Sequence, residues 1–174
     1  KILDAARMVF AEKGINQARI DDITERADIG KGTFYNYFRT KEDLVRELMT
    51  NVLMDLNQVI KKNCQNVTNL TELLDSLIAT HIRFFSDRWE DFVLFFQGRT
   101  DRTLQEGYQG IEAPFINYLD QVEQLIAAVM HHGLPPNVLR RMACAVAGLV
   151  SGYYSFAVIA SKDDDIDAVF KSLR

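Results

Sequence analysis

Apolar residues recur at helical spacing along almost the whole chain. At its start, Ile2, Ala6, Val9 and Phe10 lie on one face of an expected helix, and Gly14 follows as a stop signal. No stretch shows the strict alternation of apolar and polar residues that is typical of a half-buried strand, and no internal repeat is visible. The pattern therefore predicts an all-α protein.

The same spacing predicts a series of further helices. They cover residues 20–27, about 30–38, 41–64, 70–85, 92–98, 114–130, 137–160 and 163–174. Thr40 and Asn69 are expected N-caps, and acidic residues follow each of them in the first helical turn, where the helix dipole favours negative charge. The stretch "HHGLPP" (131–136) is an abrupt stop.

Two of these short helices, 20–27 and 30–38, are joined by only three residues, which is helix-turn-helix spacing. The second helix of such a motif enters the DNA major groove. Phe34 and Phe38 are expected to point inward. The remaining positions offer small, hydroxyl, amide and cationic groups suited to phosphates and base edges, namely Lys31, Gly32, Thr33, Tyr35, Asn36 and Tyr37.

The segments "KILDAARMVFAEKG" and "IDDITERADIGKGTFYNYFRTKEDL" resemble the TetR-like bacterial transcription regulators, strongly over about the first fifty residues. The resemblance implies a homodimer with a three-helix DNA-binding domain (1–45). It also implies a larger helical domain (46–174) that binds a small molecule and dimerises. It places the six residues above on the DNA-facing helix and makes Lys41 a phosphate anchor at a helix N-terminus.

The chain departs from the family pattern at two points of this motif. Ala18 and Arg19 stand where Thr or Ser often precedes the second helix, which weakens the expected cap, although Arg19 could contact a phosphate. Asp28 and Gly30 occupy turn positions that often carry Gly and Ser. Asp tolerates left-handed backbone and Gly is an acceptable N-cap, so we expect the geometry to be kept.

Residues 142–160, "MACAVAGLVSGYYSFAVIA", contain no charge, and a run of that length is also a candidate membrane span. Its small residues instead favour close packing of helices, because they let two backbones approach each other. Helices 137–160 and 163–174 resemble the dimer bundle of the family, so we expect a dimer interface and no membrane segment.

Aromatic residues are concentrated in the middle of the chain. They fit either an ordinary core or the lining of an apolar ligand cavity, because such cavities are mostly aromatic with a few polar groups. His81 has the spacing of a core residue but is also a candidate polar contact. The candidate ligand-binding residues are His81, Phe85, Trp89, Phe92, Phe96, Gln97, Tyr118 and Tyr153.

Charge and composition limit the kinds of partner that this chain can bind. Residues 1–48 contain 9 Lys/Arg and 9 Asp/Glu, and residues 49–174 contain 11 and 15, which gives the net charge of −4. DNA can therefore bind only through a local cationic patch. Cys64 and Cys144 lie far apart and near no histidine pair, which predicts two buried thiols in a reducing, cytoplasmic compartment with no metal or cofactor. No signal peptide is visible at the start.

These observations predict a ligand-responsive transcriptional regulator. We expect a repressor that reads an approximately palindromic operator and releases it on binding a small apolar or aromatic molecule, with the helix from Lys41 to about Cys64 as the lever. Two alternatives stay open. An all-α enzyme would need convergent acid/base or metal groups, which the spacing of the histidines does not supply. A regulator of the same fold could instead respond to a protein partner.

Overall fold

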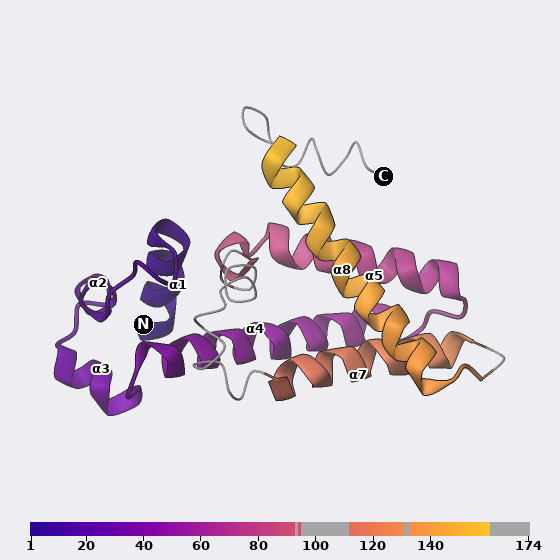
Figure 1. The fold of residues 1–174 in the computed structure, drawn as a ribbon, viewed down its shortest axis with the longest axis horizontal. Helices are drawn as coiled ribbons and strands as arrows, with labels where there is room; N and C mark the ends of the chain where they lie inside the picture. Colours follow the sequence, from indigo (N-terminus) through magenta and orange to yellow (C-terminus); the bar gives the residue numbers. More distant parts are fainter. Residues whose placement is uncertain (93, 95–111, 131–132, 161–174) are drawn as a thin grey trace.

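The computed structural model describes residues 1–92, 94, 112–130 and 133–160, with side chains up to Gly152. The helices with defined bounds are α1 (Ile2–Lys13), α2 (Ile20–Arg26), α3 (Lys31–Tyr37), α4 (Lys41–Cys64), α5 (Leu70–Ser86), α7 (Glu112–Val129) and α8 (Pro136–Ala160) (Figure 1). No strand occurs within these residues, which confirms the predicted all-α class. The expected helices 92–98 and 163–174 lie largely or wholly outside them.

Helices α1 to α3 pack together at one end of the molecule around a small core of their own (Figure 1). Phe10, Ile23 and Phe34 are its largest fully buried side chains from these helices. The chain leaves α1 at Gly14, whose φ of 78° lies in the left-handed region that glycine adopts without strain, as the stop signal predicted.

The helix-turn-helix backbone forms despite the two departures from the family pattern. Before α2, the side chain of Asp22 accepts a hydrogen bond from the backbone N–H of the N-cap residue Arg19 at 2.8 Å, so this first-turn carboxylate supplies the half of a capping box that does not depend on Thr or Ser. After α2, Asp28 adopts a φ of 51°, a left-handed conformation that Asp tolerates. Gly30 is then the N-cap residue of α3.

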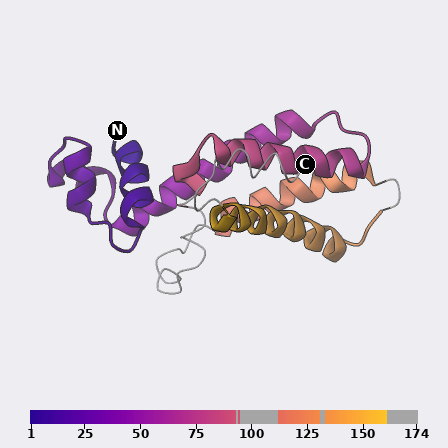
Figure 2. The ribbon, with the colours of Figure 1, turned by 90° about the horizontal axis from the view of Figure 1, so that it is seen from above.

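Helix α4 extends from this small core through the rest of the molecule (Figure 2). Its start is fixed by Thr40, whose hydroxyl accepts the N–H of Asp43 at 3.1 Å while the Asp43 carboxylate accepts the N–H of Thr40 at 3.2 Å. Leu44 and Leu48 belong to the N-terminal core, whereas Leu56 and Ile60 belong to the next one. The division at residues 45 and 46 stays a prediction, since α4 crosses it as one continuous helix.

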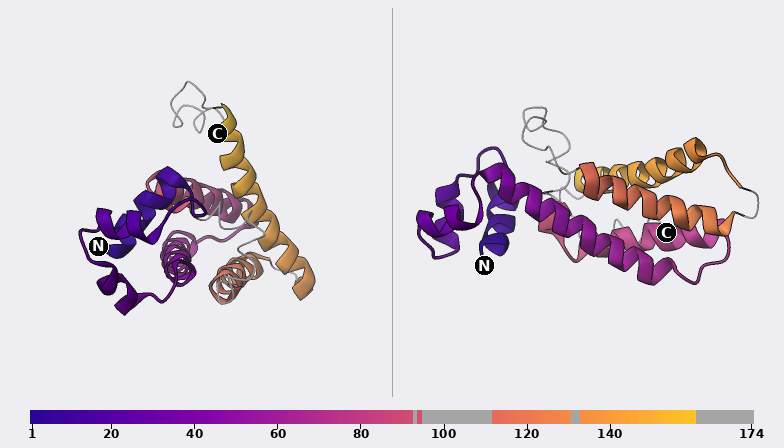
Figure 3. Two further views of the ribbon diagram at one scale, coloured as in Figure 1. Left: turned by 60° about the vertical axis from the view of Figure 1, so that its left-hand side comes forward. Right: turned by 90° about the horizontal axis from the view of Figure 1, so that it is seen from below.

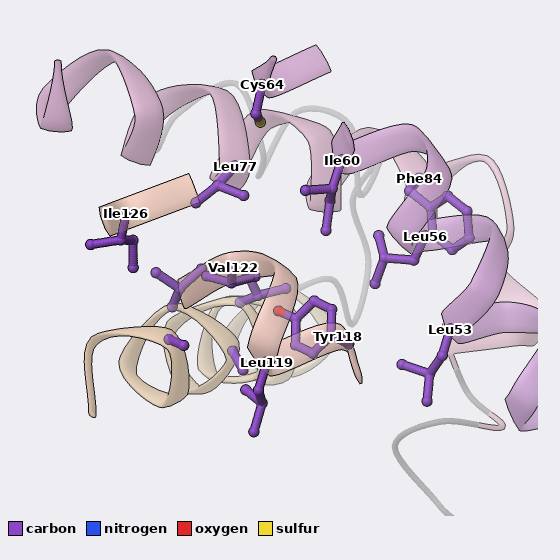
Figure 4. Close-up of a cluster of buried hydrophobic side chains, with 14 of the residues drawn as sticks. Leu53, Leu56, Ile60, Cys64, Leu77, Phe84, Tyr118, Leu119, Val122 and Ile126 are labelled. Carbon is purple, nitrogen blue, oxygen red and sulfur yellow. The ribbon is translucent and has the colours of Figure 1, made fainter. Parts of the chain in front are cut away.

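The larger, C-terminal core is formed by α4, α5, α7 and α8. Figure 4 shows Leu56 and Ile60 of α4, Leu77 of α5 and Val122 and Ile126 of α7 directed into a common interior. Helix α8 packs against α5 and α7 and crosses them obliquely (Figures 1 and 3). Apolar burial of this extent is the main stabilising contribution to such a bundle.

Two predictions about this region need correction. Helix α7 begins at Glu112 and not at Pro114, because proline is tolerated in the first turn, where its missing N–H has no intrahelical partner. Cys64 is buried as predicted, but Cys144 is exposed, since it lies on the face of α8 that points away from the core of its own chain. Among the described residues, no helix has the length and apolar character required to cross a membrane.

Candidate DNA-binding surface and ligand cavity

Helix α3 is attached to the N-terminal core by one face only. Phe34 is fully buried there, with ring centroids 5.8 Å from Phe38 and 5.4 Å from Tyr35. Every other residue of α3 is exposed, namely Lys31, Gly32, Thr33, Tyr35, Asn36 and Tyr37. These are the six residues that the sequence placed on the DNA-facing helix.

The exposed face of α3 combines aromatic area with hydrogen-bonding groups. Tyr35 is 52% exposed and Tyr37 72% exposed. Beside them, a side chain added at Gly32 would meet no atom within 4 Å, so the space above this glycine is open to an approaching partner. A helix with hydroxyl and amide groups and an accessible backbone can donate to phosphates and read base edges.

Ion pairs on the surface of this region hold the small helices together. Lys13 Nζ lies 2.7 Å from Asp22 Oδ1, and a bidentate pair joins Arg26 to Glu12. The hydrogen bond from Lys13 lowers the pKa of Asp22, and the hydrogen bond from Arg26 lowers the pKa of Glu12. Lys31, on α3, is 2.6 Å from Asp21 Oδ1 of α2, and both side chains are exposed.

The two other predicted DNA contacts occupy different positions. Arg19 is exposed at the start of α2. The ammonium group of Lys41 points into the protein, where it donates to the carbonyl oxygens of Ile15 at 2.7 Å, Ala18 at 3.0 Å and Asn16 at 3.4 Å. Lys41 therefore ties the start of α4 to the connection between α1 and α2, and its contact with a phosphate stays an untested prediction.

A small apolar cavity lies between α4, α5, α7 and α8. Its lining residues are Leu53, Leu56, His81, Phe85, Phe92, Phe115, Tyr118, Ala147, Val150 and Ser151. About 20 Å³ of space remains between them, roughly enough for one water molecule. A larger ligand would have to widen it.

Four of the predicted ligand-binding residues line this cavity: His81, Phe85, Phe92 and Tyr118. Trp89 lies behind the lining, stacked on Phe92 with ring centroids 5.2 Å apart. Phe96, Gln97 and the side chain of Tyr153 lie outside the described residues. The sequence interpretation missed six lining residues, namely Leu53 and Leu56 in the middle of α4, Phe115 of α7, and Ala147, Val150 and Ser151 of α8.

His81 is both a core residue and the main polar group of the cavity. It is 2% exposed; its Nε2 lies 2.9 Å from the hydroxyl of Tyr118, and its Nδ1 lies 2.6 Å from the carbonyl oxygen of Leu77. Since a carbonyl can only accept, Nδ1 carries the proton and Nε2 accepts from Tyr118. Burial lowers the pKa of His81, against the opposing effect of the Leu77 carbonyl, so the imidazole is neutral at pH 7.

Within the described part of the chain, no cluster of three or more His, Cys, Asp or Glu side chains is arranged to hold a metal ion. None of the described residues that line the cavity is Lys, Arg, Asp or Glu. The arrangement is therefore suited to binding, with an outward-facing helix at one end and a neutral, apolar interior at the other.

A helix-turn-helix with an exposed second helix, followed by a larger helical bundle, defines a DNA-binding transcriptional regulator. Residues 2–48 match the family described as "Bacterial regulatory proteins, tetR family". Over these residues the chain carries the DNA-binding domain of TetR-like transcriptional regulators, as the motif "GTFYNYFRTKEDL" had indicated.

Two relatives extend the similarity beyond the N-terminal domain, and a solved structure has the same fold. The HTH-type transcriptional regulator YvdT of Bacillus subtilis (strain 168) is 27% identical over 172 residues, which cover 98% of this chain and 88% of that protein. The fatty acid metabolism regulator protein of the same organism is 25% identical over 82% of this chain and 75% of its own length. The crystal structure of the transcriptional regulator FadR from Bacillus subtilis in complex with stearoyl-CoA has the same fold, with a TM-score of 0.75, 23% identity and coverage of 98% and 92% of the two chains.

Proposed function

We propose that this protein is a transcriptional repressor that binds its operator as a homodimer and releases it when a small apolar molecule enters the C-terminal cavity. The observation that carries the proposal is the exposure of all residues of α3 except Phe34. The exposed face of this helix, with two tyrosines, an asparagine, a threonine and a lysine, does not pack against the core of its own chain. It has the composition of a helix that enters a major groove.

A face of α8 supports the dimer. Cys144, Ala145, Gly148, Leu149 and Gly152 are exposed and follow one side of this helix, and Leu149 is 52% exposed. Small and apolar residues in such a row permit close helix packing against a second copy, and we assign the interface to 137–160 together with 163–174. A two-fold dimer would place two α3 helices in successive major grooves, which implies an approximately palindromic operator.

The cavity determines the class of effector that we propose. The described residues that line it are apolar apart from His81, Tyr118 and Ser151, and none of them is charged, so a neutral aliphatic or aromatic group fits it better than an ionised one. A long acyl chain, as carried by the stearoyl-CoA bound to FadR of Bacillus subtilis, is one such group. Because little space is present without a ligand, occupation must separate the helices that line the cavity, and this change is what would alter the spacing of the two α3 helices.

The DNA-binding part of the proposal is tested by selection from a pool of random duplexes at fixed, moderate salt. We expect the wild type to enrich a palindrome and Tyr37→Ala to enrich none while keeping its helical circular dichroism. Tyr37→Phe is the matched control, because it keeps the ring and removes only the hydroxyl. If Tyr37→Ala enriches the same palindrome as the wild type, α3 is not the reading helix.

The effector part is tested with the selected operator and acyl-CoA esters of increasing chain length. We expect thermal stabilisation of the protein and weaker operator binding with the same chain-length dependence. A matched variant, Val150→Asp, places a charge in the cavity and should abolish both effects. Stabilisation without any change in operator affinity would contradict release by these ligands and would favour a regulator that responds to a protein partner.

A further inference from the structure

The residues that follow α5 touch both cores of the molecule within one helical turn. Residues 89–92 and Leu94 are helical. Phe92 lines the cavity and belongs to the C-terminal core, whereas Leu94 is buried in the N-terminal core. Residues two apart on a helix point to nearly opposite sides, so this turn lies between the two cores and contacts each with a different side chain.

Asp91, the neighbour of Phe92, forms a charged contact across the same boundary. It is 3% exposed. Its Oδ1 lies 2.8 Å from Nε of Arg7 on α1, an ion-pair distance without hydrogen-bond alignment, and its Oδ2 lies 2.9 Å from Nε of Arg88. Arg88 also donates to Asp55 Oδ2 of α4 at 2.8 Å and lies over the ring of Phe84, 4.8 Å from its centroid.

Because of these ion pairs, a movement of the turn changes how well the buried charge of Asp91 is compensated. Burial raises the pKa of Asp91, while Arg7 and Arg88 act in the opposite direction and Asp55 and Glu90 add to the rise. A buried carboxylate is tolerated because cations compensate it, and removing one partner leaves charge that is only partly compensated. If widening of the cavity displaces the turn that contains Asp91, Arg7 and α1 must therefore move with it, or the buried Arg7–Asp91 ion pair must break.

We propose that the Arg7–Asp91 ion pair is the coupling contact through which the cavity acts on the DNA-binding domain. When the cavity widens, Phe92 is displaced and the turn moves as a unit, so that Asp91 draws Arg7 and α1 out of their operator-competent position. The proposal rests on the proposed function, because it assigns the route of the response. It differs from transmission along α4 alone, which would need neither Arg7 nor Asp91.

The experiment replaces the unidentified ligand by a side chain. Val150→Phe adds bulk to the cavity wall from α8, far from the ion pair in sequence, and is combined with Arg7→Met or with Asp91→Asn. Arg26→Met is the matched control. Arg26 likewise forms an arginine–carboxylate ion pair that involves α1, but its partner is Glu12, so the pair joins α1 to α2 and not to the C-terminal core. Amide hydrogen exchange of α1 and affinity for the selected operator are measured for each single and double variant.

We expect Val150→Phe to raise exchange in α1 and to weaken operator binding, each by about 5-fold or more, which is the lower end of ordinary coupling between sites. Both effects should disappear in the Arg7→Met and Asp91→Asn backgrounds and persist with Arg26→Met. Equal effects in all backgrounds, or no effect on α1 in any, would overturn the proposal. Ser151→Leu serves the same purpose if Val150→Phe does not fold.

The exchange measurement separates this proposal from the proposed function. It requires no DNA, so a selection that enriches no operator would count against the repressor while the exchange data still decide whether the cavity and α1 are coupled through Arg7. In the converse outcome, the selection finds an operator, and Val150→Phe weakens binding to it as much in the Arg7→Met background as in the wild type. That result would keep the repressor and reject the ion pair as its coupling contact.

Discussion

The two cores of this protein differ in where their candidate functional residues lie: on the outer surface of the N-terminal core, and in the interior of the C-terminal core. In the N-terminal core the apolar side chains are packed inside and the proposed function belongs to the outer face of α3, where polar and aromatic groups are exposed. In the C-terminal core the proposed function belongs to the interior, where the cavity is lined by the same kinds of side chain that stabilise the bundle. Function and stability are therefore separable by mutation in the first core and entangled in the second.

The largest effect that would sharpen this contrast is expected from α3 itself. Phe34→Ala removes a fully buried ring, and we expect the free energy of unfolding of the N-terminal core to fall by about 3–5 kcal/mol, as for other buried aromatic residues. Tyr35→Ala, one residue away on the exposed face, should change stability by less than about 0.5 kcal/mol. Urea unfolding followed by circular dichroism measures both.

The same pair of variants should be indistinguishable in DNA binding, although for different reasons. Phe34→Ala would lose the operator because α3 is no longer held, and Tyr35→Ala because a contact is missing. If Tyr35→Ala lowers stability as much as Phe34→Ala does, the outer face of α3 contributes to the fold, and the contrast between the two cores fails.

A smaller effect is expected at Lys41, a predicted DNA contact whose ammonium group donates hydrogen bonds within the protein. Lys41→Met removes the ammonium group that donates to the carbonyl oxygens of Ile15 and Ala18, and we expect unfolding to become easier by about 1.5–3 kcal/mol, as for hydrogen bonds to charged groups. The salt dependence of operator affinity should not change.

Lys31→Met is the matched control for this lysine. Its ammonium group is exposed next to Asp21, so stability should hardly change, whereas loss of one phosphate contact lowers the slope of log K against log salt by about 0.9. If Lys41→Met lowers this slope and leaves stability unchanged, Lys41 is the phosphate anchor that the family resemblance implied.

The sequence was informative where one local pattern carries both fold and function. Helical spacing alone placed Phe34 inside and Tyr35 and Tyr37 outside, and Asp28 and Gly30 took the conformations that their chemistry allows. This works because a short helix on a small core has only one buried face, so every other position must be exposed.

The same reasoning fails where the environment comes from residues far along the chain. Leu53 and Ala147 line the cavity, but their spacing is that of any core residue. Lys41 meets carbonyl groups more than twenty residues earlier, and Asp91, which follows α5, meets Arg7 of α1. Cys144 was expected to be buried because the two cysteines show no disulfide or metal-site spacing, and yet it is exposed on α8. Such contacts depend on the packing of helices, which periodicity does not specify.

The last expected effect concerns pH and tests whether the interior of the second core is as water-excluded as its lining indicates. Burial lowers the pKa of His81 in the folded protein, so below about pH 6.5 the unfolded chain binds a proton that the folded chain does not. Stability must therefore fall as the pH drops from 7 to 5, with a contribution from this residue of up to about 1.4 kcal/mol per pH unit below 6.5.

His81→Leu should lack this contribution, and the difference between the two stability profiles isolates it from the other titrating groups. Tyr118→Phe should keep it, since the imidazole stays buried without the hydroxyl. Parallel profiles for the wild type and His81→Leu would mean that water reaches the imidazole, and the cavity would then be a hydrated site with a polar ligand in place of the apolar one proposed.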